Sequence, residues 1–238
     1  MPANNSRLDR LLSKRLNIKR KAIKPFIAQH IIEVNGVRVF NVDMPVNQFS
    51  VIKVNGETLQ EKQAYYVMLN KPKGYVSATK DTIHPTIMEL IHEPFRDELR
   101  IVGRLDFNTT GLMLLSNDTD WSHSLSHSTK NIMKRYLVTV KEPIDYSRYQ
   151  HTFTQGIYFK QENTMTLPAT LVEINRYQAY LDISEGKYHQ VKRMFGHFNN
   201  EVVELHRMSI GEFRLCEKLT PGSYKMIQPE EPSFLIRR

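Results

Sequence analysis

Positive charge is distributed unevenly along this chain. Residues 1–62 hold 11 Lys and Arg side chains against 5 Asp and Glu, whereas residues 63–238 hold 22 against 20. The first quarter of the chain therefore carries net +6 of a total of +8. This distribution predicts a small basic domain over 1–62 and a larger, nearly neutral domain over 63–238, joined by a polar linker over 59–63. A partner that is a polyanion is expected, and nucleic acid is favoured.

Apolar side chains in the basic segment recur at helical spacing. The leucines between Leu8 and Leu16, and the apolar residues between Ala22 and Ile27, predict two short helices that pack against each other. The pairs Asn35-Gly36 and Asn55-Gly56 suit type I′ turns. We therefore expect a hairpin around the first pair and a further strand before the second, which makes the segment a small α+β domain.

The helical stripes are flanked by eight basic side chains and one acidic side chain, Asp9. A solvated charged face is the ordinary explanation for a run of charges, but an imbalance of this size favours a surface that binds phosphates. The predicted RNA contacts in this segment are Arg7, Arg10, Lys14, Lys19, Arg20, Lys21 and Lys24.

Residues 63–238 contain more strand-like than helix-like segments. Strands are expected over 65–70, 111–116, 135–140, 169–174, 179–183 and 201–208, and helices near 86–91, 121–127, 147–155 and 189–198. Leu137–Val140 is rich in β-branched residues and is predicted to be a central strand. The expected fold class is α+β, with a largely antiparallel mixed sheet flanked by helices.

Asp106 is the strongest candidate for a catalytic group. It lies between Gly103 and Gly111, directly before an apolar strand. From the residues alone, two interpretations stay open: a carboxylate that caps its own turn, which is the commoner use of Asp in such a sequence, or a carboxylate presented for chemistry.

Several motifs, in order along the chain, resemble one enzyme family. The sequence from Gly103 to Leu112 matches G-R-L-D-x-x-T-x-G-L, the signature of the RsuA-type branch of the RNA pseudouridine synthases. The motifs K-P-x-G, K-x-Y-x-V, E-G-x-x-x-Q-V-K-R-M and L-x-R-x-x-I-G are similar to motifs of the same family and begin at Lys71, Lys134, Glu185 and Leu205. The basic segment resembles the S4 RNA-binding domain in Arg7-Leu8-Asp9 and Val34-Asn35-Gly36.

The resemblance implies a role for each matched residue. Asp106 would be the catalytic carboxylate and Lys192 its basic partner, at a position where most family members have Arg. Tyr136 would stack on the target uracil, while Arg104, Leu205 and Gln190 would belong to the substrate pocket. Lys71 and Lys73 would contact RNA. Taken alone, each of these residues also has an ordinary structural explanation, such as a core tyrosine or a surface lysine.

No metal or cofactor is expected. The single cysteine, Cys216, forms no intrachain disulfide and no Cys-based zinc site, and His123 and His127 lack the glutamate of a zinc-binding H-E-x-x-H helix. No nucleotide-binding glycine motif occurs, which fits an isomerisation without redox change. The sequence has no apolar run of membrane-spanning length, and we expect a cytoplasmic monomer without membrane attachment.

The details of the motifs resemble the small-subunit branch of the family, which implies 16S rRNA as substrate, alone or in a partly assembled small ribosomal subunit. A 23S rRNA pseudouridine synthase and a non-catalytic S4-type rRNA-binding protein are the alternatives. A glycoside hydrolase is disfavoured because that class generally uses two carboxylates, and only one acid here has a distinctive sequence context.

Overall fold

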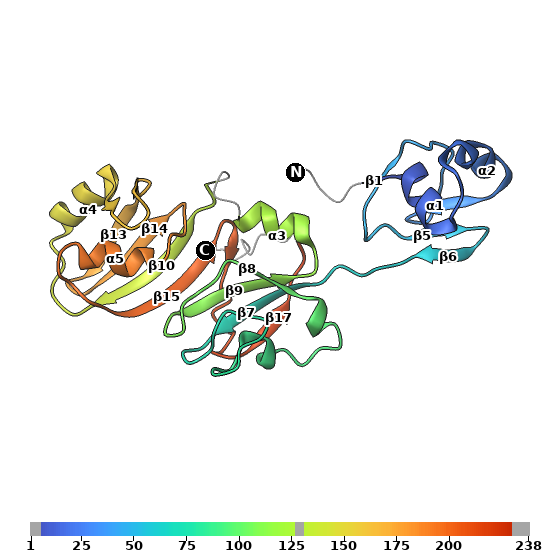
Figure 1. The fold of residues 1–238 in the computed structure, drawn as a ribbon. Helices are drawn as coiled ribbons and strands as arrows, with labels where there is room; N and C mark the ends of the chain where they lie inside the picture. Colours follow the sequence, from blue (N-terminus) through green and yellow to red (C-terminus); the bar gives the residue numbers. More distant parts are fainter. Residues whose placement is uncertain (1–5, 127–130, 230–238) are drawn as a thin grey trace, which may run out of the picture. The chain divides into compact units, whose positions relative to one another are not determined.

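The chain forms two compact units in a computed structural model, which describes residues 6–126 and 131–229. The division lies between Ala64 and Tyr65 (Figure 1). Leu59 and Gln60, which were expected in the linker, instead belong to strand β6 (Glu57–Gln60). The Gln60 side chain is buried and donates hydrogen bonds of 2.9 Å to backbone carbonyls, which explains why this polar residue is part of the first unit.

The first unit consists of short helices and short antiparallel strands. Its helices are α1 (Leu8–Leu16), the 3-10 turn η1 (Arg20–Ala22) and α2 (Ile23–Gln29). Strands β2 (Ile32–Val34), β3 (Val37–Arg38), β5 (Ile52–Val54) and β6 form a sheet in the order β3-β2-β5-β6, and β1 (Ser6–Arg7) pairs with β4 (Pro45–Val46). The predicted helices and the predicted hairpin are confirmed.

Both Asn-Gly pairs form the tight turns that the sequence predicts. The φ angles are 51° and 78° at Asn35 and Gly36, and 52° and 86° at Asn55 and Gly56, so both central residues of each turn are left-handed, as a type I′ turn requires. The turns close the hairpins β2–β3 and β5–β6. Helices and sheet share one apolar core, formed by Leu8, Leu12, Ile23, Ile27, Ile32, Val34, Val46 and Ile52.

The second unit is built on a nine-stranded sheet. Its main strands are β7 (Tyr66–Lys71), β9 (Thr110–Ser116), β10 (Lys134–Val140), β13 (Thr170–Asn175), β14 (Gln178–Ile183), β15 (Val202–Ile210) and β17 (Tyr224–Met226). Two shorter strands, β8 (Arg100–Val102) and β16 (Phe213–Arg214), pair with β9 and β15. A separate small hairpin joins β11 (Tyr158–Phe159) to β12 (Thr164–Met165).

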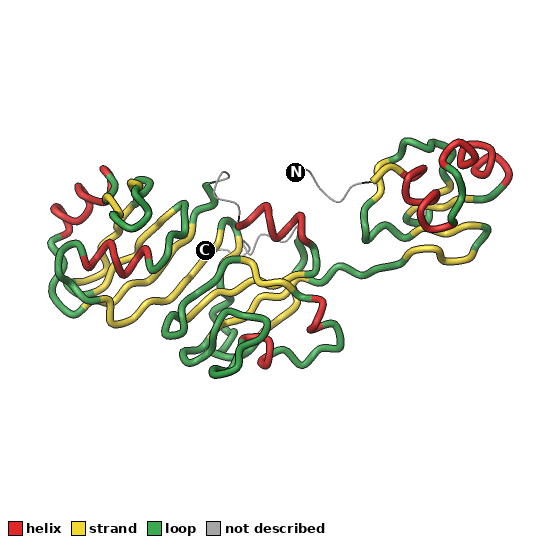
Figure 2. Tube along the Cα trace, in the orientation of Figure 1, coloured by secondary structure: helices red, strands yellow, loops and turns green. Residues whose placement is uncertain are grey.

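The sheet is mixed because of one pairing. The strand order is β13-β14-β10-β15-β9-β7-β17, and the strands are yellow in Figure 2. In this sheet β15 and β9 run parallel, while the other neighbours are antiparallel. Strand β10 lies inside the sheet, as predicted for Leu137–Val140. The expected mixed, largely antiparallel sheet is therefore confirmed.

Helices cover the two faces of the sheet unequally. Helices α4 (Tyr146–Gln155) and α5 (Gln190–Gly196) pack on one face, in a core that includes Tyr149, Phe153, Met194 and Phe195. Helix α3 (Thr119–Ser126) packs on the other face, against Leu112 and Leu114 of β9. Strands β7 and β9 are covered on both faces, which is why they are almost continuously apolar.

Two expected helices differ from the prediction. The helix near 86–91 is a 3-10 turn, η2 (Ile87–Leu90), which begins at a capping box in which the Thr86 amide donates to the Glu89 carboxylate at 2.8 Å. Four residues are too few to propagate an α-helix. The helix near 121–127 is α3, and His127 lies outside the described residues.

Candidate active site

Asp106 lies on the loop between β8 and β9. The loop turns where the Thr109 amide donates to the Asp106 backbone carbonyl at 3.1 Å. Within the described residues, the Asp106 carboxylate accepts no backbone hydrogen bond, in contrast to the Asp81 carboxylate, which accepts from the amides of Ile83 and His84. About a third of the Asp106 side chain is exposed (31%). The carboxylate is thus presented to solvent and does not cap its own turn.

Arg207, on β15, holds the first half of this loop. Its guanidinium is buried and donates to the carbonyls of Leu112 at 2.8 Å, Gly103 at 3.0 Å and Arg104 at 3.4 Å. Hydrogen bonds from a buried charged donor are stronger than those between neutral groups. Ser77 adds a reciprocal pair with the backbone of Leu105, at 2.7 and 3.0 Å. The path of the chain into Asp106 is therefore fixed by buried groups.

Lys71, at the end of β7, holds the second half of the loop. Its ammonium donates to the carbonyls of Thr109 at 2.7 Å, Pro72 at 3.1 Å and Phe107 at 3.2 Å. Burial lowers the pKa of Lys71 to about 8, although the negative charge of Asp106 opposes the shift. The side chain has no exposed surface. The expectation that Lys71 contacts RNA is therefore wrong: it supports the Asp106 loop from beneath.

Two basic side chains approach the Asp106 carboxylate. Lys192 Nζ lies 3.4 Å from Oδ2, as the sequence predicts, and His189 Nε2 lies 3.4 Å from Oδ1. Lys192 is on α5, and His189 directly precedes that helix. A nearby positive charge favours the ionised form of a carboxylate. The arrangement thus presents a partly exposed carboxylate whose two oxygens each have a basic neighbour.

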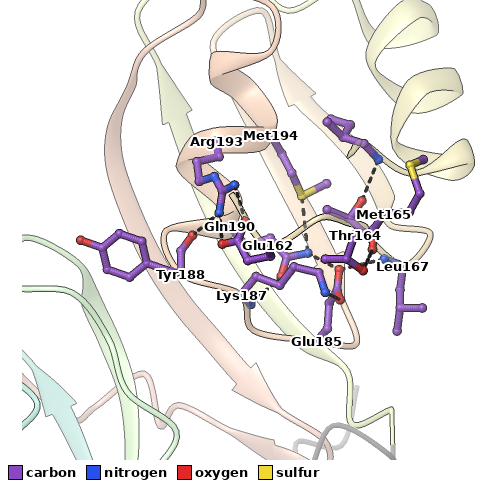
Figure 3. A network of polar contacts seen from close by, with 12 residues as sticks. Glu162, Thr164, Met165, Leu167, Glu185, Lys187, Tyr188, Gln190, Arg193 and Met194 are labelled. Carbon is purple, nitrogen blue, oxygen red and sulfur yellow. Dashed lines mark hydrogen bonds and ion pairs between the residues drawn. The ribbon is translucent and has the colours of Figure 1, made fainter. Parts of the chain in front are cut away.

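Gln190 does not line a substrate pocket. Its side chain is 3% exposed, and its Nε2 donates to Glu185 Oε1 at 2.7 Å while its Oε1 accepts from the Lys187 amide at 2.9 Å. These bonds hold the turn that leads into α5 (Figure 3). The expected pocket role of Gln190 is therefore corrected to a supporting role behind His189 and Lys192.

The remaining predicted pocket residues are distributed around the loop. Tyr136 on β10 and Leu205 on β15 are each 7% exposed and belong to the same apolar cluster as Leu105, the residue before Asp106. Arg104 is exposed. Lys73 is also exposed, and its Nζ lies 3.6 Å from Glu204.

The basic residues of the first unit are of two kinds. Arg7 and Arg20 donate to the buried Asp9 carboxylate at 3.0 and 2.9 Å, and Arg7 also pairs with Asp43. Burial alone would raise the pKa of Asp9, but the hydrogen bonds from Arg7 and Arg20 outweigh it and the net pKa is lowered. The other predicted contacts are exposed: Arg10, Lys14, Lys19, Lys21 and Lys24.

Comparison with known proteins identifies the family. The sequence profile described as RNA pseudouridylate synthase matches residues 65–197. The chain belongs to the RNA pseudouridylate synthase family. Ribosomal small subunit pseudouridine synthase A of Pseudomonas aeruginosa is 44% identical over 226 residues, which cover 94% of this chain and 98% of that protein. The protein of the same name in Escherichia coli K12 is 38% identical over 231 residues, covering 97% and 100%.

Structural comparison agrees with this family. A crystal structure described as that of a pseudouridylate synthase matches with a TM-score of 0.69 and 36% identity, covering 95% of this chain and 98% of that one. In the described parts of the chain, no group of three or more His, Cys, Asp or Glu side chains is arranged to hold a metal ion. Among those same residues, no helix is long and apolar enough to cross a membrane.

The sequence analysis gave no role to the supporting residues Arg207 and His189, and it gave Lys71 the wrong role; Arg207 and Lys71 each left a signal in the sequence. Arg207 lies two residues after the buried Leu205, so the period of a strand places both on one face. Lys71 ends an apolar strand that is buried on both sides. His189 left no comparable signal, because its position depends on a left-handed backbone conformation (φ 48°, ψ 32°) that histidine rarely adopts.

Proposed function

We propose that this chain converts a specific uridine of 16S rRNA to pseudouridine, with Asp106 as the catalytic carboxylate. The relatives named ribosomal small subunit pseudouridine synthase A support the small subunit as the target, at 38–44% identity over nearly the whole chain. The large-subunit alternative has no comparable support. The observation that carries the proposal is the Asp106 carboxylate, partly exposed, between Lys192 and His189, on a loop anchored by buried donors.

The chemistry fits this arrangement. Pseudouridine formation breaks the N1–C1′ bond of uridine and makes a C5–C1′ bond, and the hydrogen on C5 leaves as a proton. Three routes serve this reaction: attack of a carboxylate on C1′, attack on the base, or removal of a sugar proton. Each requires an ionised carboxylate close to the nucleotide. Lys192 places its ammonium 3.4 Å from the Asp106 carboxylate.

The neighbouring residues supply the pocket. We assign to Tyr136 the stacking of the target uracil, because an aromatic face holds a base without fixing its rotation about the face normal. Leu205 would form an apolar wall, and the exposed Arg104, two residues before Asp106, would occupy the space that the flipped base leaves in the RNA.

The first unit would bind the RNA backbone. Its exposed lysines and arginines support an S4-like, phosphate-directed role with modest sequence selectivity. We assign to the enzyme a monomeric state, a cytoplasmic location and either 16S rRNA or a partly assembled small subunit as the substrate. In the second unit, the exposed Lys73 would add a further contact with an RNA phosphate.

The test compares Asp106→Asn with Asp97→Asn, an exposed aspartate elsewhere in the same unit. Unmodified 16S and 23S transcripts and a partly assembled small subunit are incubated with each protein, and pseudouridine is mapped with a carbodiimide reagent. We expect one site in 16S rRNA for the wild type and Asp97→Asn, and none for Asp106→Asn, with RNA affinity retained. Pseudouridine formed by Asp106→Asn would exclude the catalytic role, and a wild type that binds but never modifies rRNA would favour the non-catalytic alternative.

A further inference from the structure

The Asp106 carboxylate is held by two basic side chains of different kinds. Lys192 lies beside Oδ2 and His189 beside Oδ1, both at 3.4 Å. His189 is three residues before Lys192 and just outside helix α5. A single cation leaves a carboxylate free to rotate about its Cβ–Cγ bond, whereas a partner on each oxygen fixes the plane of the group. One contact on each oxygen therefore restricts the orientation of the Asp106 carboxylate.

The backbone at His189 is in an unusual conformation. Its φ of 48° and ψ of 32° are left-handed, a region that few residues other than glycine occupy. Residues at this point of a helix usually have extended backbone, and their side chains cap the helix. His189 does neither, and its side chain makes no capping hydrogen bond. With this backbone conformation the ring lies beside Asp106, with Nε2 3.4 Å from Oδ1.

Buried and paired side chains hold this conformation in place (Figure 3). The Arg193 guanidinium donates to the Tyr188 carbonyl at 3.1 Å, and the Arg193 amide donates to the His189 carbonyl at 3.0 Å. The same guanidinium makes two bonds to Glu162, at 2.6 and 2.8 Å, and lies 3.6 Å from the centre of the Phe159 ring. Arg193 therefore links the turn before His189 to the β11–β12 hairpin.

The plane of the imidazole is set by Tyr188. The two rings are stacked, with centroids 3.9 Å apart and planes 21° from parallel. The Tyr188 side chain points away from the polar network in Figure 3, and it is 69% exposed. The imidazole Nε2 lies 3.4 Å from Asp106 Oδ1.

We propose that His189 is a positioning residue for the proposed reaction: its imidazole and the Lys192 ammonium hold one oxygen each of the Asp106 carboxylate and so orient it toward the nucleotide. This inference rests on the proposed function and gives Asp106 a second basic partner beside Lys192. It also assigns a purpose to Gln190, Arg193 and Glu185, whose hydrogen bonds shape the turn that carries His189.

The charges around His189 leave Asp106 as its main electrostatic partner. Arg193 is paired with Glu162, and Lys187 is paired with Glu185 at 2.9 Å, so these four charges largely cancel. Lys192 is a like charge that shares the same carboxylate. Lys71 lies on the buried side of the loop and interacts electrostatically with Asp106. The Tyr188 ring stacks on the imidazole.

The experiment removes the ring without disturbing the backbone. Glycine adopts positive φ freely, so His189→Gly keeps the turn and leaves a space the size of the imidazole. Release of tritium from RNA labelled at uridine C5 gives kcat and KM at pH values from about 6 to about 8.5, the range in which histidine changes charge. His197→Asn removes an imidazole from the far end of α5 and is the matched control.

We expect His189→Gly to lower kcat roughly tenfold near pH 6 while KM changes less than about twofold, because the lost interaction orients the carboxylate and does not bind RNA. The ratio of wild-type to variant kcat should shrink as the pH rises, because histidine side chains in general lose their positive charge over this range. Added imidazole should restore activity to His189→Gly and leave His197→Asn unchanged.

Four outcomes would overturn the inference: an unchanged kcat, an effect on KM alone, a loss of the same size at every pH, or no rescue by imidazole in a folded variant. Folding is checked by circular dichroism and by RNA binding. A wild-type protein that forms no pseudouridine would instead refute the proposed function, so the two failures are distinguishable.

Discussion

Gly111 lies directly against the backbone of Arg207. A Cβ atom at Gly111 would be 2.4 Å from the Arg207 carbonyl oxygen and 2.6 Å from its amide nitrogen. The two residues are partners in the parallel pairing of β9 and β15. This pairing brings the Asp106 loop, which precedes β9, next to the Arg207 guanidinium that holds it. The close approach of the two backbones therefore helps to determine where the Asp106 loop lies.

Gly111→Ala should destabilise the second unit by about 3 kcal/mol or more, because it combines the steric contact with a φ of 104° that alanine rarely adopts. Urea unfolding followed through the single tryptophan, Trp121, measures the effect. Gly196→Ala is the matched control, since Gly196 has open space around its Cβ position and ordinary φ. Equal stability of the two variants would show that the strands separate at little cost.

The sequence predicts the elements of the fold better than their long-range pairing. The Asn35-Gly36 turn, the helical stripe of α1 and the β-branched strand β10 are local patterns with a local cause, and each was predicted. The parallel contact of Thr110 with His206 joins residues far apart in the sequence, and nothing in either strand specifies it. The short strand β17 was also missed, because Tyr224–Met226 is too short to show alternation.

The sequence predicted those contacts of the site that join two residues of family motifs. Asp106 and Lys192 were expected to pair, and they lie 3.4 Å apart. The resemblance implied an RNA contact for Lys71 and a substrate-pocket role for Gln190, yet both side chains are buried and hydrogen-bonded to the segments that carry the site. Burial of a polar side chain depends on tertiary packing, so its residue type alone does not reveal it.

Replacement of Lys192 separates its charge from its shape. Lys192→Met should reduce kcat by about a hundredfold, because the carboxylate loses the cation at 3.4 Å, whereas Lys192→Arg should stay within about tenfold of the wild type. Tritium release from labelled 16S rRNA measures both, and Lys160→Met, at an exposed position, is the control. Full activity of Lys192→Met would mean that this cation is dispensable.

The exposed lysines of the first unit should set the salt dependence of RNA binding. Replacement of Lys14 and Lys21 by Gln should weaken RNA binding. It should also make the negative slope of log K against log salt shallower by roughly 1 to 2, because each lost phosphate contact reduces the size of that slope by about 0.7 to 0.9. Filter binding to a 16S rRNA fragment at several salt concentrations gives the slope. The exposed pair Lys160 and Lys218, replaced in the same way, should leave it unchanged. If the two double variants have equal slopes, the first unit is not the RNA-binding surface.

The buried Lys71 should make the stability of the second unit depend on pH. Its pKa is lowered from an ordinary value of 10.5 to about 8, chiefly by burial. Between these two values the unfolded chain binds a proton that the folded protein lacks, so unfolding takes up a proton and the free energy of unfolding rises with pH. Below about pH 8 both states are protonated, and the full cost of burying the charge is present. The slope that this residue contributes is at most about 1.4 kcal/mol per pH unit.

Lys71→Met isolates this contribution. The difference in unfolding free energy between wild type and Lys71→Met, measured with urea and Trp121 fluorescence at about pH 7.5, 8.5 and 9.5, should shift in favour of the wild type as the pH rises. Over the same range the wild-type enzyme should lose activity, because a neutral amine has only two protons for the carbonyls of Pro72, Phe107 and Thr109. A difference in stability that is constant with pH would show that Lys71 keeps its proton throughout, and that hydrogen bonds to the three carbonyls compensate fully for its burial.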